Sequence, residues 1–434
     1  MKSLLIRAEN KNKWERRTPL VPADVIWLVE NHTIPVFVEH SNKRFFQMLE
    51  YEQAGATPVN DMMPGDIILG VKEIPISKIL DNKTYLFFSH TIKGQHENMP
   101  LLRRIMSGNC TLIDYEKITD ENDHRLIFFG RYAGDVGAIN ILWLMGEHWR
   151  CHGIDTAFIN CKQAIHYHSL QEAELHMREV GAEISKHGLP ASLTPVVIGI
   201  LGYGNVSTGV QTIMECLPVI RIEPEELPGL ASRANIDNQH VYLTVFKEEH
   251  LVRRKDGAAF NKDDYFNQPE RFESQFEQYL PHLTILVNAI YWDDRYPRFV
   301  TWEGLKRVAT SGTSKLAGIA DITCDVGGSV ECNVKVTSSS QPAYRINPLN
   351  QHIEDGHCGN GIVVLAVDNL PAEIPNDAST FFSKQLKPFI PAILRADFSK
   401  SLEKSGLPAE IKKAVIVYKG ELMPDYEYLQ DYLS

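Results

Sequence analysis

Ionisable side chains follow several apolar segments in the first third of the chain, and each segment has the composition of a buried strand. Lys72 and Glu73 end "DIILGVKE", His90 ends "YLFFSH", Glu116 follows "TLIDY", and Arg17 lies in "WERRTPLVP" after the first segment. If these strands form a parallel sheet, their carboxyl ends share one edge, where ligands bind in open α/β sheets. Lysine and histidine can transfer protons there, and arginine can bind a carboxylate through paired hydrogen bonds. The sequence therefore predicts an acid–base site for a substrate that carries carboxylates.

A glycine turn near the middle of the chain has the pattern of a dinucleotide-binding site. In "VIGILGYGNVS", Gly202 and Gly204 follow an apolar strand directly, and Ser207 is a small residue at the third glycine position. The second glycine lets a pyrophosphate approach the N-terminus of the following helix. Glu223 ends the next strand about 20 residues on, the spacing of an acid that binds the ribose of NAD, whereas Arg221 could instead meet the 2′-phosphate of NADP. A nicotinamide cofactor beside the predicted acid–base edge suits hydride transfer to or from a C–N bond.

Apolar strands alternate with helical segments, which predicts an α/β fold with largely parallel sheets covered on both faces. The expected strands of the first unit are 3–9, 34–39, 66–72, 84–90 and 111–115, and its expected helices are 22–31, 45–54 and 97–107. An apolar helix at 133–150 could connect two domains, and a second helix is expected at 169–187. The second unit opens with the glycine turn and continues through strands near 283–292 and 316–325, and 361–394 is expected to be helical.

Length, charge and cysteine content exclude several classes of protein. A chain of 434 residues exceeds one compact core, so two or three domains are expected. The net charge of -11 argues against nucleic acid as a partner, and no apolar run approaches the ~20 residues of a membrane helix. Seven scattered cysteines without a C-x-x-C motif predict free thiols and a cytoplasmic location.

Two groups of potential metal ligands are incomplete. One group is His148, Cys151 and His152, and the other is His352, His357 and Cys358. Neither offers a full set of zinc ligands by its spacing, so no metal is expected.

Several longer motifs point to a known family. They are "KNKWERRTPLVP", "LGVKE", "FFSHTIKGQHENM", "LIDYEK", "GRYAGDVGAINIL", "GYGNVSTG", "NAIYW", "DITCDVGGSVE" and "VDNLPAEIPNDAS". Together they resemble the lysine-forming saccharopine dehydrogenases, and in particular the lysine–2-oxoglutarate reductase half of the bifunctional aminoadipic semialdehyde synthase. More distantly, the chain resembles alanine dehydrogenase and the soluble nucleotide-binding part of transhydrogenase.

The resemblance implies two Rossmann-like domains with a cleft between them. Residues 1–135 and 345–434 are expected to form the substrate domain, residues 150–340 the dinucleotide-binding domain, and 133–150 the connecting helix. It implies acid–base roles for Lys72 and His90, with Glu116 tuning both. The implied substrate-binding residues are Arg17, Glu73 and Arg131. The implied cofactor-binding residues are Gly202, Tyr203, Gly204, Asn205, Val206, Ser207, Arg221, Glu223, Asn288 and Asp325.

The resemblance also implies an activity, the reductive condensation of L-lysine with 2-oxoglutarate to saccharopine, or its reverse, by a stand-alone reductase. It favours NADPH as the cofactor, whereas Glu223 favours NADH. The expected partners are these small molecules, and a homo-oligomer is left open. Two alternatives remain at this point: an alanine-dehydrogenase-like enzyme, and a non-catalytic regulatory protein that binds a dinucleotide.

Overall fold

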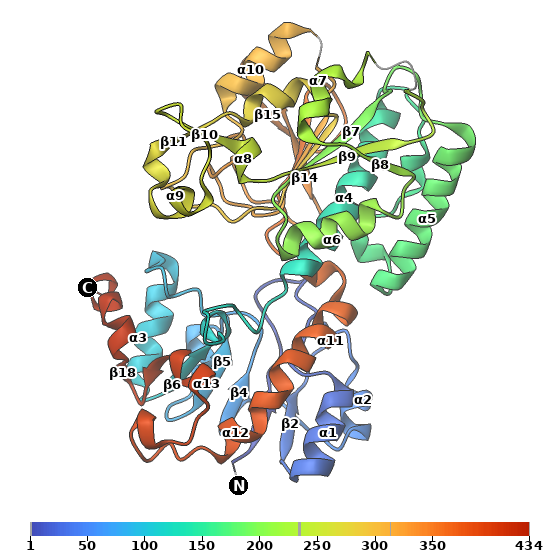
Figure 1. Cartoon of the computed structure of the whole chain (residues 1–434). Helices are drawn as coiled ribbons and strands as arrows, with labels where there is room; N and C mark the ends of the chain where they lie inside the picture. The colour runs from blue at the N-terminus through green and yellow to red at the C-terminus, as the bar shows by residue number, and fades with distance from the viewer. Residues whose placement is uncertain (1, 233–235, 313, 434) are drawn as a thin grey trace. The chain divides into compact units, whose positions relative to one another are not determined.

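The computed structural model describes residues 2–232, 236–312 and 314–433, and the chain divides into two compact units (Figure 1). The first unit contains residues 1–129 and 375–434, and the second contains residues 130–374. The first unit is therefore discontinuous in sequence. The expected return to it near residue 345 is too early, because residues 343–365 form strands of the second sheet.

The first unit is built on an eight-stranded sheet with the order β18-β17-β6-β5-β4-β1-β2-β3. The strands are β1 (Leu4–Ile6), β2 (Val36–Glu39), β3 (Thr57–Val59), β4 (Ile67–Leu69), β5 (Thr84–Phe87), β6 (Thr111–Asp114), β17 (Val415–Tyr418) and β18 (Glu421–Leu422). The first six strands are parallel, β17 is antiparallel to β6, and β18 is antiparallel to β17. The carboxyl ends of β1, β4, β5 and β6 consequently lie along one edge, as predicted.

Helices cover this sheet and bury its apolar side chains in one core. They are α1 (Pro22–His32), α2 (Met48–Gln53), α3 (Met99–Ser107), α11 (Pro375–Leu386), α12 (Ile390–Arg395) and α13 (Ala409–Lys413). Residues of β1, β4 and β5 are buried throughout, which explains why these strands are continuously apolar.

The second unit contains another eight-stranded sheet, with the order β15-β14-β16-β13-β12-β7-β9-β8. Its strands are β7 (Val196–Leu201), β8 (Val219–Arg221), β9 (Val241–Phe246), β12 (Ile285–Asn288), β13 (Gly318–Asp321), β14 (Ala343–Asn347), β15 (His352–Asp355) and β16 (Ile362–Leu365). A separate hairpin contains β10 (Val252–Arg254) and β11 (Phe272–Ser274). The strand β16 corrects the expectation of helix throughout 361–394, because this short buried apolar run has no periodicity that separates a strand from a helix.

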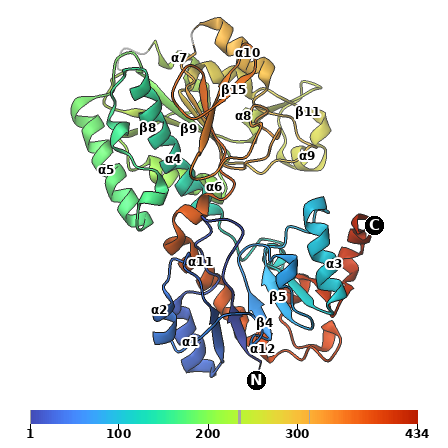
Figure 2. The same ribbon diagram turned by 180° about the vertical axis from the view of Figure 1, so that it is seen from behind.

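Helices lie on both faces of this second sheet (Figures 1 and 2). They are α4 (Gly130–Cys151), α5 (Leu170–His187), α6 (Asn205–Met214), α7 (Leu227–Leu230) and α10 (Trp302–Ser311). Two short helices, α8 (Glu248–Leu251) and α9 (Lys262–Asn267), accompany the β10–β11 hairpin. Val196 and Ile198 of β7 pack in the core with α4, α5 and α6, whereas Val197 packs in the core with α7 and α10. Both units therefore have the predicted Rossmann-like layering.

Two further observations bear on the sequence-based expectations. Cys151 and Cys358 form a disulfide, so the prediction of free thiols is wrong for this pair; their separation of 207 residues hides the pairing in the sequence. The other five cysteines are free. Within the described ranges, every helix is too short or too polar to cross a bilayer.

Candidate functional site

Backbone pairing brings Lys72, Glu73 and His90 out at one edge of the first sheet. β4 and β5 pair in parallel, and the pairing continues beyond both strands: Gly70 N–H donates to the Leu86 carbonyl at 2.9 Å, and Phe88 N–H donates to the Val71 carbonyl at 3.1 Å. Lys72 directly follows Val71, and His90 is two residues after Phe88, so both predicted proton-transfer residues lie just beyond the last paired residues.

The imidazole of His90 is bonded to the neighbouring carboxylate. His90 Nδ1 lies 2.6 Å from Glu73 Oε1, and Lys11 Nζ lies 2.8 and 3.0 Å from the two oxygens of Glu73. Burial raises the pKa of Glu73, but the hydrogen bond from His90, its charge and Lys11 outweigh burial and lower this pKa to about 2. An ionised carboxylate only accepts hydrogen bonds, so Nδ1 carries the hydrogen of this contact, and Nε2 is the ring nitrogen that Glu73 does not bind.

The backbone at His90 has an unusual conformation that its neighbours hold in place. His90 has a φ of 50°, which is uncommon for a residue other than glycine. Ser89 N–H donates to buried Asp114 Oδ2 at 2.9 Å, and Asn98 Nδ2 donates to the His90 carbonyl at 3.1 Å. These contacts fix the direction in which the imidazole leaves the sheet edge.

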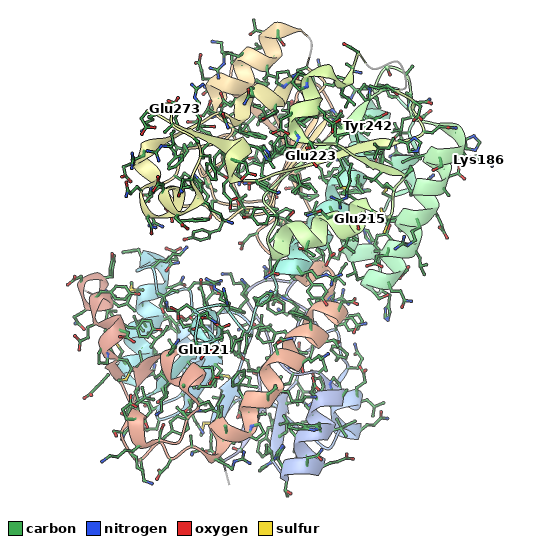
Figure 3. All side chains as sticks on the ribbon, in the orientation of Figure 1. Glu121, Lys186, Glu215, Glu223, Tyr242 and Glu273 are labelled. Carbon is green, nitrogen blue, oxygen red and sulfur yellow. A yellow bond between two sulfur atoms is a disulfide. The ribbon has the colours of Figure 1, made fainter. Side chains whose placement is uncertain are left out.

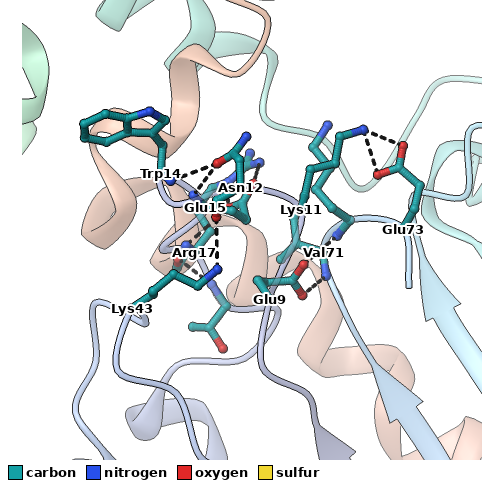
Figure 4. A network of polar contacts seen from close by, with 12 residues as sticks. Glu9, Lys11, Asn12, Trp14, Glu15, Arg17, Lys43, Val71 and Glu73 are labelled. Carbon is teal, nitrogen blue, oxygen red and sulfur yellow. Dashed lines mark hydrogen bonds and ion pairs between the residues drawn. The ribbon is translucent and has the colours of Figure 1, made fainter. Parts of the chain in front are cut away.

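A buried acid that sequence reasoning missed positions Lys72. Glu9 accepts a hydrogen bond from Val71 N–H at 2.7 Å (Figure 4). It accepts another from Lys72 N–H at 3.1 Å, and its carboxylate pairs with Arg7 at 3.0 Å. Burial raises the pKa of Glu9, and Arg7 opposes this effect. Two opposite charges follow β1 within three residues, which is the signal that could have identified the pair.

The predicted substrate-binding arginine already has an internal partner. Arg17 Nε and Nη2 lie 2.8 and 2.6 Å from the two oxygens of Glu15, and both side chains are buried. The guanidinium also lies 4.2 Å from the ring centre of Phe129. Figure 4 shows Arg17 and Glu15 side by side on the segment after β1. A substrate carboxylate at Arg17 must therefore compete with Glu15 for the guanidinium.

Two other predicted residues have different surroundings. Glu116 follows β6 and pairs with Arg125, and both line a cavity of about 500 Å³ in the first unit. Arg131 lies on α4 in the second unit, where its Nε is 3.7 Å from Asp135 Oδ2. The structure therefore assigns Arg131 and Arg17 to different units.

The glycine turn has the geometry that a dinucleotide requires. Gly202 has a φ of 88°, and a side chain there would meet Ile290. At Gly204 a Cβ would meet no protein atom within 4 Å, so the space in front of it is open. Asn205 begins α6, Val206 is half-buried, and Ser207 is buried in the first turn. Because the helix N-terminus supplies N–H groups and a positive dipole, the residues present fit a bound pyrophosphate.

A cavity of about 310 Å³ adjoins this turn, and an acid is part of its wall. Its lining includes Gly202, Tyr203, Gly204, Phe246 and Glu248. The Tyr203 hydroxyl lies 2.9 and 3.0 Å from the Glu248 oxygens, and Lys262 Nζ donates to the same hydroxyl at 2.6 Å.

The prediction that Glu223 binds the cofactor ribose rests on a strand order that the structure corrects. The ribose acid belongs at the end of the strand beside the glycine-turn strand. The neighbour of β7 is β9, and β8, which Glu223 follows, is at the sheet edge. Glu223 is exposed, and Arg221 pairs with Glu215; Figure 3 labels Glu223 and Glu215 in the second unit. The strand β9 therefore separates β8 from β7, and Glu248 is the acid that follows the strand beside the glycine turn.

The last two predicted cofactor residues differ in exposure. Asn288 at the end of β12 is buried, and its Nδ2 donates to Asp321 Oδ1 at 2.8 Å and Ser329 Oγ at 2.9 Å. Burial raises the pKa of Asp321. Asp325 is exposed in the loop after β13. The buried hydrogen bond of Asn288 to Asp321 therefore joins the carboxyl ends of β12 and β13, whereas the side chain of Asp325 is exposed to solvent.

Two Rossmann-like units, one of them with a glycine turn at a helix N-terminus, define the two-domain fold class of the dinucleotide-binding dehydrogenases. Residues 5–135 match the model described as "Alanine dehydrogenase/PNT, N-terminal domain", and residues 248–425 match the corresponding C-terminal domain. The two models of this family together cover most of the chain, which therefore belongs to the alanine dehydrogenase/PNT family, as the resemblance of its motifs implied.

Individual relatives give a finer likeness. The chain is 37% identical to the alpha-aminoadipic semialdehyde synthase of Arabidopsis thaliana over 98% of its own length and 41% of that protein. It thus spans less than half the length of this curated relative. It is 25% identical to the saccharopine dehydrogenase [NAD(+), L-lysine-forming] of Yarrowia lipolytica over 89% of the chain and 90% of that protein. Among solved structures, an L-alanine dehydrogenase has a TM-score of 0.64 at 18% identity, covering 99% of this chain and 100% of the other, which supports the fold.

Proposed function

We propose that this chain is a lysine–2-oxoglutarate reductase, which condenses L-lysine with 2-oxoglutarate to saccharopine or catalyses the reverse reaction. The observation that carries the proposal is the joint placement of Lys72 and His90 on neighbouring parallel strands, with Glu73 fixing the imidazole. The extended likeness to aminoadipic semialdehyde synthase and to lysine-forming saccharopine dehydrogenases supports the choice of substrates.

The proton-transfer residues suit the steps that imine formation requires. The lysine ε-ammonium must lose a proton before it attacks the keto carbon, and the resulting carbinolamine must then lose water. His90 Nε2 can accept the first proton and return it to the departing hydroxyl, while Glu73 holds the imidazole and stabilises its charged form. Lys72, placed by Glu9, is the second acid–base group. The nicotinamide cofactor, when bound, supplies the hydride that reduces the imine.

We further propose that NADH is the preferred cofactor. Glu248 lines the cavity at the glycine turn, where its carboxylate can accept hydrogen bonds from ribose hydroxyls and would repel a 2′-phosphate. Lys247, the residue directly after β9, and Lys262 are the cations that would favour NADPH instead. Replacing Glu248 with glutamine should therefore lower kcat/KM for NADH relative to NADPH by about tenfold. An unchanged ratio would contradict the role of Glu248.

One assay separates this function from its alternatives. With lysine and 2-oxoglutarate both present, the protein should oxidise NADH, and omission of either substrate should abolish the reaction. Faster turnover of pyruvate with ammonia would favour an alanine dehydrogenase. Absence of any turnover in a protein that binds the dinucleotide would favour the non-catalytic alternative. The cytoplasmic location remains a prediction from composition.

The acid–base roles are tested by substitution. Lys72→Met and His90→Gln should each lower turnover by about 100-fold or more, with little change in cofactor affinity, because the glycine turn is in the other unit. The double variant should lose much less than the product of the two single losses if both residues serve one relay. Lys93→Met and His40→Gln are matched controls, since both side chains are exposed in the same unit. Near-normal turnover of Lys72→Met would refute the mechanism.

A further inference from the structure

Sulfur and imidazole ligands meet in the second unit, at the end of α4. Cys151 is the last residue of this helix and forms a disulfide with Cys358, which lies between β15 and β16; their Cα atoms are 5.5 Å apart. His357 directly precedes Cys358. The ligand atoms of Cys151, His357 and Cys358 all lie within 4.8 Å of one another. Two segments that are distant in sequence therefore supply two sulfurs and a nitrogen to one place.

The neighbouring residues hold His357 next to the helix. His148 Nδ1 lies 2.7 Å from the His357 carbonyl oxygen, and the ring of Trp143 lies 6.2 Å from that of His357. His148 is buried, and it precedes Cys151 by three residues, so both lie on one face of α4. The contact between His148 and the His357 carbonyl does not involve sulfur, so it can hold this loop beside α4 after the disulfide is reduced.

We propose that, once the disulfide is reduced, Cys151, His357 and Cys358 bind a thiophilic divalent cation such as Zn²⁺. Bonds of ~2.3 Å to sulfur and ~2.0–2.1 Å to nitrogen place neighbouring ligands of a tetrahedral ion roughly 3.5–3.8 Å apart, a spacing that small side-chain movements can produce here. Both cysteines are exposed, so an ion can enter and water can occupy the fourth position. Spacing along the sequence did not reveal this site, because its ligands come from two separate segments.

The chemistry of the site makes the disulfide and the ion mutually exclusive. Reduction by a phosphine or a small thiol adds two electrons and two protons and yields two thiols. Binding of Zn²⁺ then releases both thiol protons, because the thiolate is the ligand. Conversely, diamide removes two electrons from the two thiolates and takes up two protons from water. The S–S bond forms again, and the ion is released.

Metal titration of the intact protein tests the proposal. The protein is reduced with a phosphine, freed of reductant under nitrogen, and titrated with Zn²⁺ against a chromophoric chelator. It should bind one ion more per chain than the Cys151→Ser/Cys358→Ser double variant, and Co²⁺ should give a thiolate-to-cobalt charge-transfer band that this variant lacks. His357→Ala should weaken binding by about tenfold or more. His352→Ala is the matched control, because His352 is exposed on β15 in the same region, and it should leave binding unchanged.

Three results would overturn the proposal. One is equal Zn²⁺ binding by the reduced wild-type protein and the double cysteine variant. Another is a Co²⁺ complex without the thiolate band. A third is retention of the ion after diamide has oxidised Cys151 and Cys358, as judged by loss of alkylation at both. None of these results depends on lysine or 2-oxoglutarate turnover, so they leave the proposed function to its own assay.

Discussion

The ion pair between Glu73 and His90 should make the stability of the first unit depend on pH in a specific way. Glu73 has a folded-state pKa lowered from 4.5 to about 2. A lowering of this size corresponds to about 3 kcal/mol, at ~1.4 kcal/mol per pKa unit. The Glu73 side chain is 13% exposed, but those of His90 and Lys11 are 32% and 39% exposed. Solvent screening of its partners reduces the expected contribution to about 2 kcal/mol.

The sign follows from the direction of the change in pKa. Because folding lowers the pKa of Glu73, its contribution is fully present above the unfolded value of 4.5 and is lost as the pH falls toward 2. Glu73→Gln keeps an acceptor for His90 Nδ1 but removes the charge. The variant should therefore be less stable than wild type by about 2 kcal/mol at pH 6, and this difference should fall to roughly 40% of that value by pH 3.5.

Urea unfolding at a series of pH values measures this difference. The two units need not unfold together, so the data are fitted with two transitions, and only the transition of the first unit should move. Glu52→Gln is the matched control, since Glu52 is exposed on α2 in the same unit and should show no such pH dependence. A difference below about 0.5 kcal/mol at pH 6, or one that grows as the pH falls, would refute the reasoning.

Three further predictions follow from the same geometry. Gly204→Val should fold normally but lose about 100-fold or more in cofactor affinity by calorimetry, because its Cβ meets no protein atom and only a bound pyrophosphate would clash; Gly229→Val, at an equally open glycine, should bind normally. Glu9→Gln places an amide N–H₂ against backbone and guanidinium donors, so it should reduce the free energy of unfolding by about 3 kcal/mol, and a loss below 1 kcal/mol would contradict the described network. Asp114→Asn should lower turnover by about tenfold with unchanged cofactor affinity, since it loosens the Ser89 contact that fixes His90; unchanged turnover would show that this support is dispensable.

The fold could be predicted wherever a local pattern determines the structure. Buried parallel strands are continuously apolar, and the first six strands of the first sheet include the five expected ones together with β3. The strand β3 has an exposed residue and contains Pro58, so it lacks that signal. Boundaries were less accurate, as the return to the first unit at residue 375 rather than 345 shows.

The sequence predicted which site residues lie close together only where strands that are consecutive in the chain also pair in the sheet. Lys72 and His90 meet one sheet edge because β4 and β5 follow each other and pair. The strand that Glu223 follows is not beside β7, because β9, which comes later in the sequence, occupies that place. Glu9 binds Lys72, and Cys151 binds Cys358, over long separations in sequence. The hydrophobic periodicity of the sequence carries no information about such contacts.

The discontinuous first unit has a consequence for the order of folding during synthesis. The Asp114 N–H donates to the carbonyl of Ala414 at 2.9 Å, and β6 pairs with β17, so the sheet that carries His90 gains these neighbours only after some 300 further residues have left the ribosome. The second unit, residues 130–374, is translated entirely within that interval and can fold first. Contacts of such long range slow folding, which leaves the edge of β6 uncovered in the nascent chain. We therefore expect nascent chains that stop before residue 415 to contain a protease-resistant second unit and a protease-sensitive N-terminal segment.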